Sequence, residues 1–294
     1  MFFIPPEINA LSVRVHTIGC VGDQLLMDQL KSVLPSDLEH VLFEYAQDAQ
    51  CNLSQSGFET SDLSVISVCA DIALHEPELI SRCKEAAANS SFTVLFVPIC
   101  AQADDDAQID PAGQNANRLK TTLEQLQHLA RYVDTLVLVP TQQFTVPIEI
   151  VCAIPMLLTR TGYIGIDFAD IKTVLSDAAS TAKNPETGFY VAQHTAYSRA
   201  DELQAAATTL TAQVQALAQQ PLQNCVASIV LSSDNLFTLD NIINAADKIY
   251  DGICIADAIR VFSAPRYSIT PGTASLLCLA GKIDLRAETL LRLQ

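Results

Sequence analysis

Apolar positions along the first half of the chain follow two periods in turn. Short runs rich in Val, Leu and Ile are separated by segments in which apolar residues recur every three or four positions. The runs predict strands over 11–18, 41–45, 63–68, 92–99 and 136–139. The segments between them predict helices over 23–33, 77–89 and 119–133. Strands that alternate with helices indicate an α/β fold with a mainly parallel sheet covered on both faces.

The second half also alternates between predicted strands and predicted helices, with fewer elements. Strands are predicted over 188–194, 226–232, 253–262 and 274–283, and helices over 200–220 and 238–250. Between the halves, Pro147 and Pro155 bracket an apolar run within 141–160. A proline inside a helix costs about 3 kcal/mol, so this run is interpreted as a strand or a broken helix.

The stretch from Thr161 to Asp177 reads T-G-Y-I-G-I-D-F-A-D-I-K-T-V-L-S-D. Two glycines bend the chain, and Asp167 and Asp170 then stand three residues apart before an apolar run. A carboxylate at the first of these positions can accept the unpaired N–H groups of a helix start. A second acid in the first turn is favoured by the positive end of the helix dipole. Spacing alone therefore predicts a capped helix.

The same stretch resembles the loop before the second domain of FtsZ, the bacterial relative of tubulin. That family has G-x-x-N-x-D-F-A-D-V-K-T-V, in which Gly165 stands here for the Asn and Ile171 for the first Val after the acids. The matching residues are Asp167, Phe168, Ala169, Asp170, Lys172, Thr173 and Val174. In the family this loop projects into the GTP site of the next subunit of a filament. The resemblance implies that Asp167 and Asp170 are catalytic in trans.

Other segments extend the resemblance over most of the chain. Residues 117–140, with R-Y-V-D-T-L-V-L-V-P, and residues 225–252 are similar to family segments, and strands 253–262 and 274–283 resemble its closing hairpin. The implied fold is tubulin/FtsZ-like. It has a Rossmann-like half over 11–145, a connecting segment with the Asp-Phe-Ala-Asp loop over 146–177, a smaller α/β half over 178–284 and a short tail over 285–294.

The nucleotide loops depart from the family pattern. The family places G-G-G-T-G-[ST]-G after the strand that corresponds to 63–68, and its backbone N–H groups hold the phosphates. Here the chain reads C-A-D-I-A-L-H-E over 69–76, and no glycine occurs between Gly57 and Gly113. Gly19 and Gly22 remain as candidate cofactor-binding residues, although a lone G-x-x-G is a weak signal and a tight strand-to-helix turn is the favoured explanation. The helix that grips the guanine base has no counterpart over 140–159.

Composition excludes several classes of partner. The formal net charge is −16, with 17 basic and 33 acidic residues, which repels nucleic acid and anionic lipid. No uninterrupted apolar run reaches the roughly 18 residues that a membrane helix needs, and the first residues lack the basic start of a signal peptide. Nine cysteines without a C-x-x-C motif favour reduced thiols, a cytoplasmic location and no zinc site. The acidic run Asp104, Asp105, Asp106 and Asp110 lacks the EF-hand pattern, so we expect a solvated loop and no metal site.

Three functional hypotheses remain. The first is a degenerate FtsZ-like pseudo-GTPase that acts through interfaces, without a cofactor, on itself or on an authentic FtsZ protofilament. It would serve as a filament component or regulator in the cytoskeleton, for instance in cell division. The alternative is a divergent GTPase that binds GTP with magnesium and polymerises with itself. The third is nucleotide-independent self-assembly, with both acids acting only as helix caps. The family's C-terminal peptide for membrane anchors has no counterpart, so no direct membrane anchor is expected.

Overall fold

The computed structural model describes fourteen parts of the chain. These are residues 11–18, 41–48, 60–69, 77–100, 113–141, 146–151, 154–155, 158, 167–179, 187–197, 199–218, 222–231, 238–263 and 273–284. Predicted features in the remaining segments lie outside the described residues. They include the helix over 23–33, Gly19 and Gly22, most of the 69–76 loop, the acidic run from Asp104 to Asp110 and the tail over 285–294.

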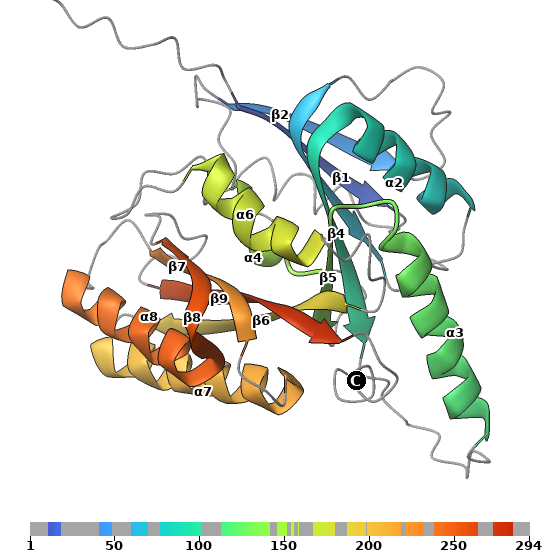
Figure 1. Ribbon diagram of the computed structural model, residues 1–294. Helices are drawn as coiled ribbons and strands as arrows, with labels where there is room; N and C mark the ends of the chain where they lie inside the picture. The colour runs from blue at the N-terminus through green and yellow to red at the C-terminus, as the bar shows by residue number, and fades with distance from the viewer. Residues whose placement is uncertain are drawn as a thin grey trace, which may run out of the picture.

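The described strands form one nine-stranded sheet of order β2-β1-β3-β4-β5-β6-β9-β7-β8 (Figure 1). Neighbours pair in parallel except β9, which is antiparallel to β6 and to β7. The bounds are β1 Leu11–Ile18, β2 Val41–Asp48, β3 Ser61–Val68, β4 Ser90–Cys100, β5 Thr135–Thr141, β6 Thr187–Tyr197, β7 Leu222–Leu231, β8 Cys254–Ser263 and β9 Thr273–Asp284. The predicted α/β class with a mainly parallel sheet is confirmed, and the sheet continues through the predicted domain boundary by pairing β5 with β6.

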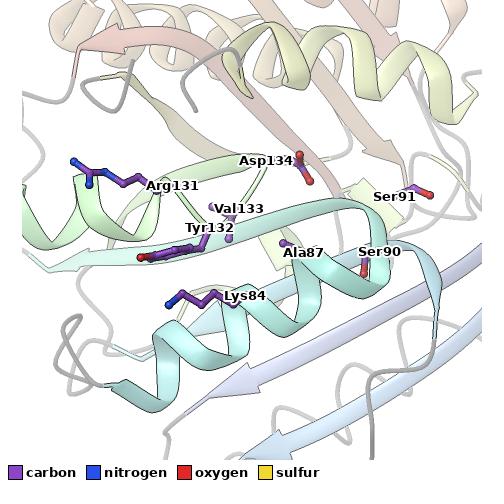
Figure 2. A pocket seen from close by; sticks show the side chains of 8 residues that line it. All are labelled: Lys84, Ala87, Ser90, Ser91, Arg131, Tyr132, Val133 and Asp134. Atoms are coloured by element: carbon purple, nitrogen blue, oxygen red, sulfur yellow. The ribbon is translucent and has the colours of Figure 1, made fainter. Parts of the chain in front are cut away.

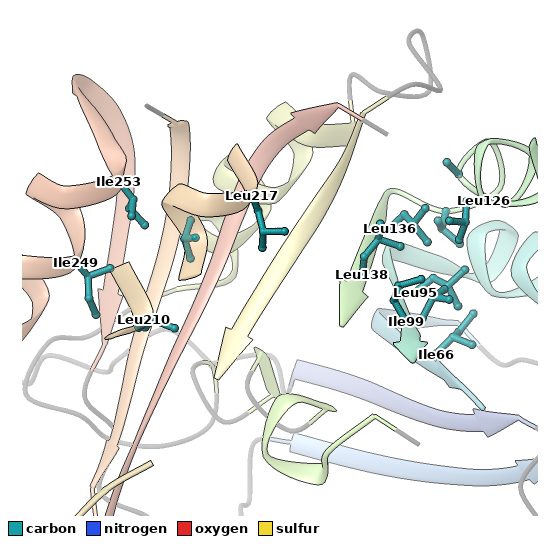
Figure 3. Close-up of a cluster of buried hydrophobic side chains, with 14 of the residues drawn as sticks. Ile66, Leu95, Ile99, Leu126, Leu136, Leu138, Leu210, Leu217, Ile249 and Ile253 are labelled. Carbon is teal, nitrogen blue, oxygen red and sulfur yellow. The ribbon is translucent and has the colours of Figure 1, made fainter. Parts of the chain in front are cut away.

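Helices cover both faces of the first half of the sheet. Helices α2 (Pro77–Asn89) and α3 (Gly113–Leu129) pack on side chains of alternate strand positions, among them Ile66, Leu95 and Leu138 (Figure 3). Helix α6 (Phe168–Ala179) lies on the opposite face, where it contacts β5 and the strands of the second half. The intervening strand residues Phe92, Val94 and Phe96 are also fully buried. Burial on both faces explains why these strands are continuous apolar runs.

The second half adds two helices in contact with each other. Helix α7 (Ala200–Ala218) packs on β6 and β9, and α8 (Leu239–Ile253) packs on α7. Leu210, Leu217, Ile249 and Ile253 belong to this part of the core (Figure 3). Helix α8 begins with a capping box in which Thr238 accepts from the Asn241 amide and the Asn241 side chain accepts from the Thr238 amide. This is the reciprocal arrangement that satisfies unpaired donors at a helix start.

One expectation from the sequence is wrong, because strands 253–262 and 274–283 do not form a hairpin. Strand β9 pairs with β6 and β7, and β8 pairs with the other edge of β7. The crossover through α8 returns the chain so that β8 runs parallel to β7. That pairing leaves β9 to fill the position between β6 and β7. In the ambiguous region 141–160, a short helix α4 (Ile148–Val151) begins directly after Pro147, where a proline is tolerated.

In the described ranges, no helix has both the length and the apolar character that crossing a bilayer requires.

The contact between α7 and α8 gives the first testable prediction. A Cβ added at Gly252 would overlap the Thr211 Cγ2 atom, so we expect Gly252→Ala to destabilise the fold by about 1–3 kcal/mol through overpacking. Thr211→Ser removes that methyl group and keeps the hydroxyl, which donates to the Ala207 carbonyl at 2.8 Å. The double variant should therefore recover most of the loss in urea unfolding. A double variant no more stable than Gly252→Ala would contradict this packing.

Candidate functional site

The stretch that carries the family resemblance begins a helix at one edge of the sheet. We call the edge at which the parallel strands β4 and β5 begin the amino edge. Helix α6 crosses this edge: Thr135 Oγ1, at the start of β5, donates to the Leu175 carbonyl at 3.2 Å. Lys172 Nζ donates to the Ser91 carbonyl, at the start of β4, at 3.1 Å. The site is therefore fixed by strands that the sequence separates from it by many residues.

Asp167 and Asp170 form a reciprocal capping box. The Asp170 amide donates to Asp167 Oδ1 at 2.9 Å, and the Asp167 amide donates to Asp170 Oδ2 at 3.1 Å. The Asp167 carbonyl accepts the first helical hydrogen bond, from the Ile171 amide at 3.4 Å. The predicted helix start is confirmed, and each residue takes the position that the spacing assigned to it.

The rest of the helix is firmly held. Ile171, Val174 and Leu175 are completely buried, which anchors the inner face of α6. The ring of Phe168 meets the ring of Phe92 edge to face, with centroids 6.4 Å apart and an angle of 77° between the planes. Such an aromatic pair contributes roughly 0.5–1.5 kcal/mol beyond area burial. The two acids therefore project from a rigid support.

Both acids remain exposed to solvent. Each uses one carboxylate oxygen in the capping box, and the second oxygen of each has no hydrogen-bond partner among the described residues. Such oxygens can accept hydrogen bonds from a water molecule or from donors of another protein. The two acids can therefore cap the helix and contact another molecule at the same time.

Asp134 lies just behind this edge, in the turn between α3 and β5. Its Oδ2 atom accepts a hydrogen bond from the Thr93 amide at 2.8 Å. Burial raises the pKa of Asp134 above the usual value for a carboxyl group, while the Thr93 amide and the charge of Lys172 act in the opposite direction. Asp134 is thus a half-buried acid that joins the starts of β4 and β5.

A pocket of about 330 Å³ opens beside Asp134 (Figure 2). It lies between the carboxyl end of α2, the start of β4 and the α3–β5 turn, and its lining residues are Lys84, Ala87, Ser90, Ser91, Arg131, Tyr132, Val133 and Asp134. Sequence reasoning missed it, because its residues come from three separate elements. The run R-Y-V-D was noted only as part of the family resemblance.

The remaining predicted site residues, Gly19 and Gly22, are not among those that the structure describes. Within the described ranges, no group of three or more His, Cys, Asp or Glu residues is arranged to hold a metal ion. The candidate site therefore consists of Asp167, Asp170 and the adjoining pocket.

The cysteines differ from expectation at one position. Cys69, buried at the end of β3, is in a disulfide bond, so the expectation of reduced thiols is wrong for it. Disulfide pairing depends on distance in the fold, which spacing along the chain does not reveal. Cys83 is free and buried, and burial raises its pKa to about 12, which leaves it unreactive as a thiol.

No family model matches the chain, and no curated protein matches it. Among solved structures it is similar to TubZ of Bacillus thuringiensis serovar israelensis. A GTPγS-form protofilament gives a TM-score of 0.47 at 11% identity, covering 79% of this chain and 65% of that chain. A GDP-form protofilament gives 0.48 at 10% identity with the same coverage. A type III plasmid segregation TubZ gives 0.47 at 10% identity, covering 79% of this chain and 67% of that chain. This chain thus spans about 65% of the length of the first TubZ chains that it matches.

The capping box predicts a measurable stability difference. Asp167→Ala removes the acceptor for the Asp170 amide and should lower the free energy of unfolding by about 1 kcal/mol. Asp167→Asn keeps an acceptor at that position and should change stability by only a few tenths of a kcal/mol. Urea unfolding of both variants measures this. Equal stabilities of the Ala and Asn variants would mean that the cap contributes nothing.

The raised pKa of Asp134 predicts a pH dependence. A carboxyl group with a raised folded-state pKa binds protons more tightly when folded, so its ionisation lowers stability as pH rises from the unfolded value of about 3.9 through the folded value. Asp134→Asn keeps an acceptor for the Thr93 amide and removes the ionisable carboxyl group. The stability of the variant relative to the parent should therefore increase as pH rises from 4 to 7 in urea unfolding. A relative stability that stays constant would contradict the assignment.

Proposed function

We propose that this protein is a degenerate tubulin/FtsZ-type pseudo-GTPase that acts through its amino edge, as a component or regulator of a filament. The observation that carries the proposal is the exposed Asp167–Asp170 box on a firmly held helix. A second observation supports the proposal: the chain has no glycine between Gly57 and Gly113, where the family's phosphate loop would fall.

The acids are suited to action on a neighbouring molecule. They project from the amino edge, whereas the candidate phosphate-binding turns follow the carboxyl ends of β1 and β3. Strands of this length separate the two edges by roughly 25 Å, at about 3.3 Å per residue. The acids of one chain therefore cannot serve a nucleotide on that chain. Action in trans, as the family resemblance implies, fits this separation.

Loss of the chain's own nucleotide site follows from backbone chemistry. A phosphate cradle needs backbone N–H groups close to the oxygens, and only glycine permits that approach without a side chain in the way. The segment 69–76 carries Asp71 and Glu76 instead, which would repel a triphosphate. We therefore expect interface contacts, and no GTP hydrolysis by this chain alone.

Two measurements on the purified protein test the proposal. Calorimetry with GTP or GDP and magnesium should show no binding. Addition of the protein to FtsZ polymers should change their GTPase rate at least twofold, and the protein should sediment with them. Tight nucleotide binding would instead support the divergent self-polymerising GTPase. Absence of any effect on FtsZ, together with absence of self-association, would refute the interface role.

A charge-removing variant distinguishes the role of the acids from their cap. Asp167→Asn/Asp170→Asn keeps acceptors at both positions, because Asn241 already fills the second position in the α8 box. The variant should remain folded and lose most of the effect on the partner polymer. Asp247→Asn/Asp251→Asn removes the same charge from exposed positions on α8 and is the matched control. Equal activity of the two double variants would show that the acids serve only as caps.

A further inference from the structure

The pocket beside Asp134 concentrates positive charge on an acidic protein. Lys84 and Arg131 line it with exposed side chains, and Lys172 donates to the carbonyl of Ser91, another lining residue. Asp134 is the one acid in the lining, and its carboxylate is already engaged by the Thr93 amide. In a chain of net charge −16, this patch has the opposite sign to the molecule as a whole. Such a patch is complementary to an acidic segment.

The pocket is also organised around an aromatic ring. Lys84 Nζ lies over the ring of Tyr132 at 4.5 Å from its centroid (Figure 2). The ring of His128 meets the same ring edge to face, with centroids 5.2 Å apart. These contacts hold Tyr132 and place the Lys84 ammonium at the wall of the pocket. The hydroxyl group of Ser91 adds a donor, whereas the hydroxyl of Ser90 is engaged with the hydroxyls of Ser61 and Ser64. The lining therefore offers cations and a hydroxyl donor of the kind that bind carboxylates.

From these features we propose that the pocket binds the acidic segment 103–110 of a second copy of this chain. The segment reads A-D-D-D-A-Q-I-D and contains four carboxylates and no basic residue. The proposal rests on the proposed function, since it names the contact by which copies associate. It assigns the pocket to the partner's acidic segment, separately from the contact made by Asp167 and Asp170.

Chain geometry excludes the same copy as the source of this segment. The segment follows Cys100, the last residue of β4, whereas the pocket is at Ser90, the first. Eleven residues of strand place these ends about 33 Å apart. Asp106 is six residues beyond Cys100, so a fully extended chain carries it about 20 Å at most. From the other direction, Asp110 is three residues before α3, and the seventeen residues of α3 span about 25 Å between that point and the pocket. Asp110 therefore cannot reach the pocket of its own chain either. A second copy stacked along the strand direction brings opposite edges together.

Charge reversal in the full chain tests the contact. Lys84→Glu/Arg131→Glu should weaken self-association at least tenfold in sedimentation velocity. Lys120→Glu/Lys248→Glu makes the same change of charge at exposed positions on α3 and α8, and should weaken it less than threefold. Equal weakening by the two double variants would overturn the proposal, because net charge alone would then explain the effect.

Complementary reversal provides a gain-of-association readout that misfolding cannot imitate. Asp104→Lys/Asp105→Lys should also weaken self-association on its own. When it is mixed with Lys84→Glu/Arg131→Glu, the reversed segment of one copy meets the reversed pocket of the other. Mixed complexes should then exceed the association of either variant alone at least fivefold. A mixture that associates no better than its components would overturn the proposal.

A peptide of residues 101–112 gives a direct measurement that does not depend on assembly. We expect it to bind the full chain, with a loss of at least tenfold in affinity for Lys84→Glu/Arg131→Glu. Its variant with Asn at the four Asp positions is the control and should bind at least tenfold more weakly. Failure of the peptide to bind would overturn the pocket assignment. The proposed function would survive that failure if Asp167→Asn/Asp170→Asn still abolished the effect on FtsZ polymers. Binding of inorganic phosphate to the pocket, with self-association unaffected by the pocket variants, would show a small-anion site instead.

Discussion

Parallel pairing of the strands is the constraint on which the rest of the structure depends. Each crossover returns the chain to the edge where the previous strand began, so the starts of β4 and β5 meet at one edge and their ends at the other. The amino edge consequently gathers the end of α2, the α3–β5 turn and the start of α6. Strands β1, β3 and β4 end together at the carboxyl edge. The pocket with Lys84 and Arg131 and the start of α6 lie at one edge only because of this separation.

Local contacts determine where helix α6 begins, and contacts with distant residues determine its position at the amino edge. Its start is decided locally, by two carboxylates that satisfy each other's backbone amides. Its position is decided by distant partners: Ile171, Val174 and Leu175 are buried, and Thr135 and Ser91 fix it to two strands. The two capping residues can be exposed without loss of helix stability, since the cap needs only one oxygen from each carboxylate. The same geometry that stabilises the helix leaves acceptors directed at solvent.

The sequence predicted strands and helices well and tertiary neighbours poorly. Strand β1 and helix α2 agree with the apolar periodicity to the residue, because burial on one face or on both leaves a direct pattern. The position of β9 between β6 and β7 left no such pattern, since the pairing partner of a strand is not encoded in its own alternation. The pocket was missed for a related reason. Lys84 and Arg131 are 47 positions apart, and only the crossover through β4 and α3 brings them to one edge.

The charge distribution also limits how copies can associate. Two molecules of net charge −16 repel each other at long range, although at physiological salt this repulsion is largely screened beyond about 8 Å. Association must therefore be decided by contacts within that range, where local charge matters more than the total. A cationic pocket at one edge and a segment of four carboxylates that begins at the other supply complementary charges at such short distances. Because the strand length keeps the two apart within one chain, the proposed attraction acts only between copies. It also favours stacking along the strands over side-by-side pairing of parallel copies, in which like edges would lie level with each other.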